Sequence, residues 1–214
     1  MELLNFLARW AHLLFGITWI GMLYYFNFVQ GGYFKKASPE GLKDAKAHLA
    51  PEALWWFRWG AMFTFITGAI LLVGVFKSYG GLNIWILCGA LMGTLMFLNV
   101  WLVIWPAQKI ALGIDGAEGD GPAAGAKALL ASRTNVLFSG PMVLAMLAGP
   151  HAGGLGGGYG AQEITTGTMV ALALVLLLEV NGLKGKMGPM TTVKGVIHSS
   201  LGLTAVVAAL LVYV

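Results

Sequence analysis

Six long apolar stretches constrain this chain more than any other feature of its sequence. They cover residues 6–30, 54–76, 83–105, 128–150, 164–183 and 192–214. Each is long enough to cross a hydrocarbon core of about 30 Å as a helix that rises about 1.5 Å per residue. Because no water satisfies backbone groups inside a bilayer, such stretches become helices. The sequence therefore predicts an all-α integral membrane bundle of about six transmembrane helices.

The composition agrees with a chain whose main solvent is lipid. Only 10% of the 214 residues are charged, whereas soluble domains have about 25%. The apolar stretches use most of the length, so we expect a single transmembrane domain over residues 1–214. The one cysteine, Cys88, excludes an internal disulfide and a cysteine-rich metal site. We expect no nucleic-acid partner, since membrane proteins collect basic residues in their cytoplasmic loops.

The distribution of lysine predicts the orientation in the membrane. Lysines gather in or beside the first, third and fifth connections, at Lys35, Lys36, Lys43, Lys46, Lys109, Lys127, Lys184 and Lys186. By the positive-inside rule these connections are cytoplasmic, and both termini face outward. Within the first connection, Ser38 and Pro39 predict the start of a short helix and Pro51 predicts its end.

Tryptophans near the ends of the predicted spans are typical of membrane-interface anchors. This interpretation covers Trp10, Trp55, Trp56, Trp59, Trp85 and Trp105.

Polar and ionisable side chains inside the spans are costly in lipid and are candidate functional groups. On the predicted topology they gather in the cytoplasmic half: Arg58, Asn99, Gln108, Arg133, Asn135, Glu179, Asn181 and His198. Glu179 follows three leucines and must be paired or protonated. Two interpretations explain these residues equally well. Glu179 forms a structural ion pair with an arginine, or Arg58 and Arg133 form an anion-binding pocket. Both interpretations stay open.

Three histidines are candidate ligands of a haem iron. His12 and His151 lie near the outer ends of the first and fourth spans, and His198 lies in the inner half of the sixth. Gly16 and Gly202 follow His12 and His198 at a spacing of four, which leaves a gap on the same helix face for a flat macrocycle. Small residues also serve helix packing in membranes, so a hydrogen-bonding role in the core is an equal alternative.

Several short motifs carry a resemblance to a known family. They are Trp10-Ala-His12-Leu-Leu-Phe-Gly16-Ile-Thr-Trp19, Arg58-Trp59 with Thr67-Gly68, Trp105-Pro106-Ala-Gln108-Lys109, and Ser132-Arg133-Thr134-Asn135 with Pro141-Met142 and His151. Together they resemble the membrane domain of the bacterial membrane-bound urate hydroxylases, and the Ser-Arg-Thr-Asn stretch is the most specific of them. The cytochrome c domain of that family, with its Cys-x-x-Cys-His motif, is absent from this sequence.

The resemblance implies a multi-pass protein of the bacterial inner membrane that oxidises a purine-type anion and passes electrons outward. The substrate-binding residues would be Arg58, Asn99, Gln108, Arg133 and Asn135, and the catalytic residues Glu179, as proton acceptor, and Arg133. A haem b would be held by His12 with His151, or by His12 with His198. The electron acceptor would be a separate cytochrome c or a larger membrane complex.

Two other functions fit the same sequence. The chain could be a non-enzymatic accessory subunit of a respiratory or photosynthetic membrane complex. It could also be a small anion transporter that uses the same arginines, although no inverted repeat is visible.

Overall fold

The computed structural model describes residues 2–81, 83–155, 157 and 162–214, and every regular element in these ranges is helical. The α-helices are α1 (Glu2–Tyr24), α2 (Gly31–Phe34), α3 (Pro39–Asp44), α4 (Ala50–Tyr79), α5 (Ile84–Leu98), α6 (Trp105–Leu112), α7 (Gly121–His151), α8 (Thr166–Lys184) and α9 (Val193–Tyr213). Three π-helical segments are η1 (Tyr25–Gln30), η2 (Ala45–Leu49) and η3 (Asn99–Ile104). Three 3₁₀ turns are η4 (Ile114–Gly116), η5 (Gly153–Leu155) and η6 (Gly188–Thr191).

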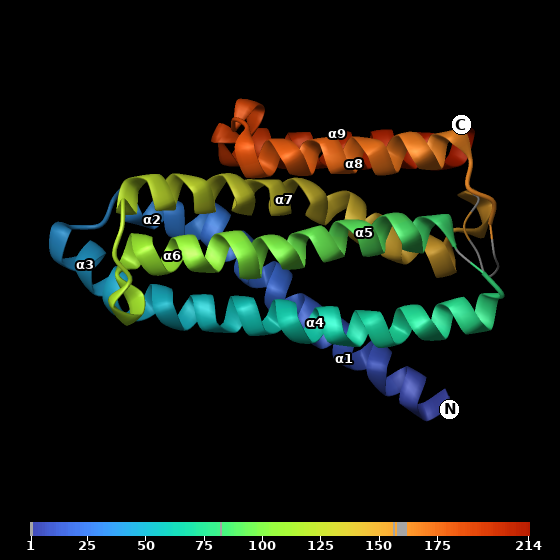
Figure 1. The fold of residues 1–214 in the computed structure, drawn as a ribbon, viewed down its shortest axis with the longest axis horizontal. Coiled ribbons are helices and arrows are strands. Elements are labelled where there is room, and N and C mark those ends of the chain that lie inside the picture. Colours follow the sequence, from blue (N-terminus) through green and yellow to red (C-terminus); the bar gives the residue numbers. More distant parts are fainter. Residues whose placement is uncertain (1, 82, 156, 158–161) are drawn as a thin grey trace.

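The helices join into a bundle of long rods (Figure 1). The π-helical segments connect α1 to α2, α3 to α4, and α5 to α6 without a break. Five helical stretches are long and apolar enough to cross a membrane: Leu3–Phe34, Pro39–Lys77, Ile84–Leu112, Thr166–Lys184 and Val193–Tyr213. The predicted all-helical membrane bundle is therefore confirmed in its general form.

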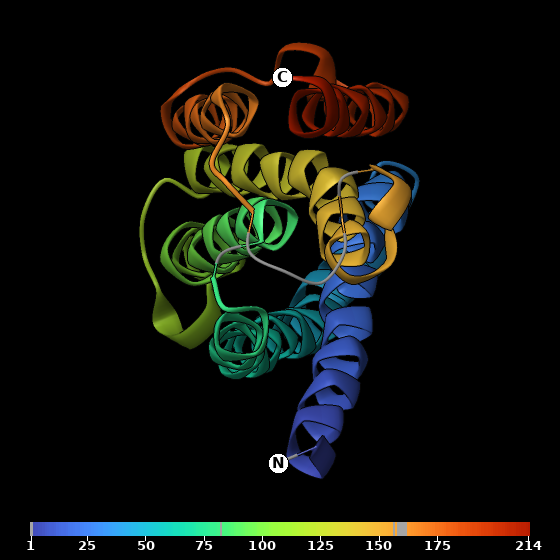
Figure 2. The ribbon, with the colours of Figure 1, turned by 90° about the vertical axis from the view of Figure 1, so that its right-hand side faces the viewer.

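The predicted fourth span lies in α7, which is not among those five stretches. At 31 residues α7 is about 46 Å long, so length does not set it apart. Figure 2 shows α7 between the α8–α9 pair and α5, and it packs against α1, α5, α6, α8 and α9. Its run from Ala131 to Ser139 is buried throughout. Because its neighbours shield it from lipid, α7 can carry polar side chains that lower its hydropathy.

Both ends of the chain lie at the same end of the bundle (Figure 1). Successive rods run in alternating directions. With an even number of such rods, the chain ends on the side where it began. The termini thus share a side, in keeping with the predicted topology, and their outward placement stays a prediction. Part of the glycine-rich connection expected between residues 151 and 163 lies outside the described residues.

Ser38 begins a helix as predicted, but Pro51 does not end it. The Ser38 hydroxyl accepts a hydrogen bond from Gly41 N at 3.2 Å. The rod then continues through η2 into α4, and Pro51 lies in the first turn of α4. Pro106 likewise lies in the first turn of α6, directly after η3. Proline has no N–H and its ring excludes the carbonyl four residues earlier, and we attribute its tolerance here to the wider π turn just before it.

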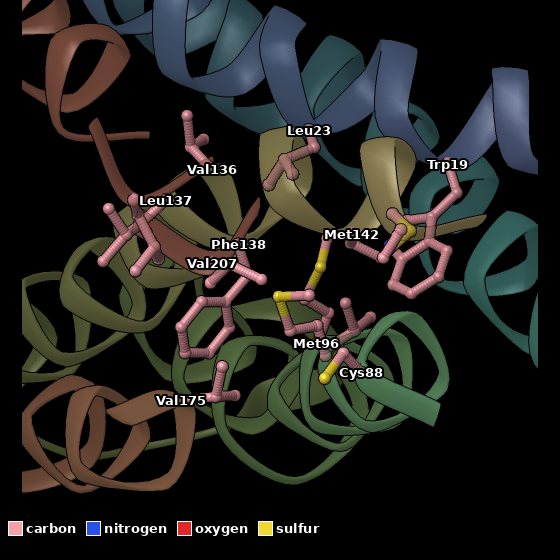
Figure 3. Close-up of a cluster of buried hydrophobic side chains, with 14 of the residues drawn as sticks. Trp19, Leu23, Cys88, Met96, Val136, Leu137, Phe138, Met142, Val175 and Val207 are labelled. Atoms are coloured by element: carbon pink, nitrogen blue, oxygen red, sulfur yellow. The ribbon is translucent and has the colours of Figure 1, made fainter. Parts of the chain in front are cut away.

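The apolar core joins α1, α5, α7, α8 and α9 (Figure 3). Phe138 and Met142 of α7 lie at its centre, with Met96 of α5, Val175 of α8 and Val207 of α9 around them. Every one of these side chains is at most 9% exposed. Dispersion contacts of this kind hold helices together in lipid. The hydrophobic effect does not drive helix association there, because lipid tails are as apolar as the side chains.

The six tryptophans predicted as anchors differ in exposure, and Trp59 and Trp105 are half-buried. Trp10, Trp55 and Trp56 are more than 40% exposed, as interface anchors would be. Trp85 is only 1% exposed, so its predicted anchoring role is wrong. It belongs to the core because the first turn of α5 faces α7 and not lipid.

Candidate functional site

The Ser132–Asn135 motif lies in the middle of the buried run of α7. Successive residues of an α-helix are turned by about 100°, so four of them reach all sides of the helix. None of the four side chains is more than 9% exposed. Each one therefore points at a different neighbouring element.

Ser132 faces the N-terminal rod. Asn27 of η1 donates its Nδ2 hydrogens to Ser132 Oγ and to Leu23 O, each at 2.8 Å. Two turns further along α7, Ser139 Oγ lies 2.8 Å from the hydroxyl of Tyr24. These polar contacts join α1 and η1 to α7 inside the membrane region.

Thr134 faces α8, where Gly182 makes room for it. A Cβ atom on Gly182 would lie 2.6 Å from Thr134 Oγ1 and 2.8 Å from its Cγ2. Real Cβ contacts are never that short, so only glycine permits this approach of α7 and α8. The Thr134 hydroxyl donates back to Leu130 O at 3.0 Å and is satisfied within its own helix.

Asn135 joins the polar cluster at the centre of the bundle. Asn99, the first residue of η3, donates from Nδ2 to Asn135 Oδ1 at 2.9 Å and to Glu179 Oε2 at 3.1 Å. Asn135 Nδ2 in turn donates to Met96 O at 3.0 Å. Asn99, Asn135 and Glu179 are at most 7% exposed. Three predicted site residues from three separate spans thus meet in one hydrogen-bonded cluster.

Glu179 is satisfied by an amide and not by an arginine. Among the described residues the one ion pair is Asp44 with His48, at 3.9 Å on the surface. The hypothesised pairing of Glu179 with Arg58 or Arg133 is therefore not found there. Asn99 gives the carboxyl group a hydrogen bond without a second buried charge.

Arg133 lies on the other side of α7. Gly140, seven residues on, shares its helix face, and a Cβ on Gly140 would lie 2.6 Å from Ser200 Oγ of α9. Arg133 is therefore turned towards α9, about 200° around the helix from Asn135. It is 7% exposed, and its Nε and Nη1 atoms have no hydrogen-bond partner in the described chain.

Arg58 belongs to an open pocket at the opposite end of the bundle from the termini. Its guanidinium carbon lies 3.8 Å from the centroid of the Trp105 ring, a close cation–π contact. The pocket has a volume of about 460 Å³ and is also lined by Trp55, Trp56, Glu52 and Asp115. It thus combines aromatic walls, one guanidinium and two carboxylates.

One comparison with known proteins decides the family. The sequence profile described as "Urate oxidase N-terminal" matches residues 74–180, which is half of the chain. The chain belongs to the urate oxidase N-terminal family. No curated protein and no solved structure matches it.

The urate oxidase N-terminal match covers α5, α6, α7 and most of α8. It includes the Asn99–Asn135–Glu179 cluster, together with Gln108, Arg133 and His151. Gln108 lies half-buried on α6. Arg58 and His12 come from the rods that precede most of the matched segment.

The candidate haem ligands of this urate oxidase-type chain do not share a cavity. His12 Nδ1 lies 2.9 Å from Thr64 O and 3.2 Å from Thr67 Oγ1, both on α4. The imidazole fills the space left by Gly68, where a Cβ would lie 2.9 Å from His12 Cε1. Gly16 thus does not supply the gap beside this ring.

His151 and His198 lie elsewhere. His151 lines a groove between α7 and α9, and His198 is exposed on α9. The described residues therefore do not fit a bis-histidine haem built on His12 with either partner, and haem binding stays a prediction.

Sequence reasoning missed several groups that the structure brings to these sites. Asn27 is a polar residue inside the first predicted span, so the depth argument that selected Asn99 could have found it. Trp105 was predicted as an anchor and as part of a family motif, and Glu52 and Asp115 were not among the predicted site residues. Their roles depend on α4 and α6 meeting at one end of the bundle, which no local pattern shows.

Proposed function

We propose that this chain is the membrane part of a urate hydroxylase-like oxidoreductase of the bacterial inner membrane, and that it binds a planar purine-type anion in the Arg58 pocket. The observation that carries the proposal is the guanidinium of Arg58, stacked on Trp105 in an open cavity of about 460 Å³. Ligand pockets commonly have volumes of about 300–1,000 Å³. The family match supplies the chemical class of the ligand.

The chemistry of the pocket suits such an anion. A flat heterocycle can stack on the indole rings of Trp55, Trp56 or Trp105. Arg58 would neutralise its charge and donate to a ring carbonyl. The carboxylates of Glu52 and Asp115 would accept hydrogen bonds from ring N–H groups, which a simple carboxylate or halide anion lacks.

Hydroxylation of a purine ring by water forms one C–O bond and releases two protons and two electrons. We propose that the electrons go to a cytochrome c-type acceptor, the kind of acceptor that the resemblance implies. Glu179 does not line the Arg58 pocket, so we assign it no proton-transfer step. Its role here is to join α8 to η3 through Asn99.

Urate titrated into the purified protein in nanodiscs tests the binding step, with quenching of tryptophan fluorescence as the signal. Arg58→Met should weaken urate binding by about tenfold or more, the typical loss of a charged hydrogen-bond partner. Arg9→Met is the matched control, since Arg9 is an exposed arginine on α1 that does not line the pocket. Acetate should not compete. Equal urate affinity in the wild type and Arg58→Met would overturn the proposal.

The same titration examines a second placement of the anion. Arg133 is a buried cation whose Nε and Nη1 have no partner in the described chain, and such groups mark ligand sites in membrane proteins. If Arg133→Lys weakens urate binding and Arg58→Met does not, the anion lies beside α9. Retention of the bundle by both variants is checked by circular dichroism.

A further inference from the structure

A second cavity lies at the end of the bundle where both termini lie. It is a groove of about 370 Å³ between the C-terminal halves of α7 and α9, closed on one side by Trp85 of α5. At Gly140 the two helices are in close contact. Figures 1 and 2 show α7 diverging from α9 towards the end of the bundle where the termini lie, and Pro141 lies inside α7. Proline inside a helix is a common cause of such a change in direction.

The lining of the groove selects a neutral, lipid-soluble ligand. Its α9 wall is made largely of alanines, among them Ala205, Ala208 and Ala209, and Leu147 of α7 faces them. No lysine, arginine, aspartate or glutamate is among the described residues that line it. A phosphate headgroup would find no counter-charge here, and the small side chains of the α9 wall leave room for a flat ring or a thin chain.

One buried donor in the wall has no partner. Trp85 is 1% exposed, and its indole Nε1–H makes no hydrogen bond within the described chain. Buried indole N–H groups are normally satisfied. His151 and Tyr213 also line the groove, so three of its lining residues carry a hydrogen-bonding group among otherwise apolar neighbours.

We propose that this groove binds an isoprenoid quinone. Its ring carbonyls would accept hydrogen bonds from Trp85 Nε1 and from the His151 imidazole, while the ring and the first prenyl units lie against the alanines of α9. A saturated acyl chain would fill the same volume but leave the Trp85 donor unsatisfied. The proposal concerns binding alone and does not depend on the Arg58 pocket, which lies at the other end of the bundle.

The test uses the full chain purified in detergent and a benzoquinone that carries a ten-carbon chain. The protein is incubated with the quinone and passed through a gel-filtration column, and the retained quinone is quantified per mole of protein. Decylbenzene and ethyl decanoate are the comparison ligands, because the first lacks carbonyl groups and the second carries only a chain ester.

Three variants test the assignment. Trp85→Phe keeps an aromatic ring but removes the donor, and it should weaken retention by about three- to tenfold, the worth of one hydrogen bond. Its matched control is Trp101→Phe. Trp101 also has a buried indole donor that lacks a partner in the described chain, but Trp101 does not line the groove. His151→Ala should weaken retention while His198→Ala should not. Ala208→Leu should abolish retention by filling the slot.

Each result decides for or against the site. Retention of the quinone well above both comparison ligands, lost in Ala208→Leu and weakened in Trp85→Phe, would support it. Equal retention of decylbenzene would mean that the groove holds only hydrocarbon and would overturn the proposal. Unchanged retention in His151→Ala and Ala208→Leu would also overturn it. Because His151 is exposed, its replacement leaves the core intact and keeps the test valid if Ala208→Leu does not fold.

Discussion

Asn99 on η3 donates to Asn135 on α7 and to Glu179 on α8 from a single amide nitrogen, at 2.9 Å and 3.1 Å. Its two N–H bonds therefore hold three rods together at the centre of the bundle. The donor comes from a π-helical segment, a distortion that often marks functional sites. Every group in the cluster lies within the segment that matches the family.

We expect Asn99 and Glu179 to be energetically coupled. Asn99→Ala and Glu179→Ala should each destabilise the bundle by about 1–3 kcal/mol, because each leaves a buried polar group unsatisfied. The double variant should lose less than the sum, with a coupling of about 0.5–3 kcal/mol. Unfolding followed by circular dichroism in detergent measures the three values. Strict additivity would show that the 3.1 Å contact contributes nothing to stability.

Gly182→Ala should separate α7 from α8. Its new Cβ would lie 2.6 Å from Thr134 Oγ1, and overpacking of this kind costs about 1–3 kcal/mol. Thr134→Ala in the same chain should restore part of the loss by removing Oγ1 and Cγ2. Gly202→Ala is the control, since nothing lies within 4 Å of its Cβ position, and it should leave the melting temperature unchanged or raise it. Equal melting temperatures for Gly182→Ala and Gly202→Ala would contradict the close approach of α7 and α8.

Asp115→Asn should strengthen binding of urate. Asp115 lines the pocket that contains Arg58, and its negative charge repels an anion bound there. An asparagine Oδ1 can still accept a hydrogen bond from a ring N–H group, so the substitution removes only the repulsion. The repulsion between two unit charges at contact distance is about 1 kcal/mol in water, so removing it should improve the affinity by about fivefold. The gain should shrink at high salt, as screening requires. Glu118→Gln, an exposed carboxylate three residues away and outside the pocket, should have no effect in the same titration.

His12 should tolerate asparagine better than leucine. An asparagine amide can replace the Nδ1 contact with Thr64 O, whereas leucine removes this hydrogen bond between α1 and α4. We expect His12→Leu to lower the melting temperature and His12→Asn to restore most of it. His48→Leu is the control, because His48 is exposed and pairs with Asp44 on the surface. An absorption spectrum of the wild type tests the haem prediction at the same time, since a bound haem would give a Soret band that His12→Leu abolishes.

The sequence alone established the helical membrane bundle and the importance of buried polar groups. Segment length and the scarcity of charged residues decide the first, because a bilayer accepts few other structures. Asn99, Asn135 and Glu179 were found because polar groups inside spans need partners, whatever those partners are.

Tertiary structure decided which groups became partners. Arg133 and Asn135 are two residues apart in the sequence, yet they face opposite sides of α7, and only Asn135 joins Glu179. Arg58 stacks on the Trp105 ring because α4 and α6 meet at one end of the bundle. Helix packing fixes such pairs through close approaches such as Gly182 on Thr134 and Gly68 on His12. These contacts join residues about 50 apart in the chain, whereas hydropathy and local motifs describe one helix at a time.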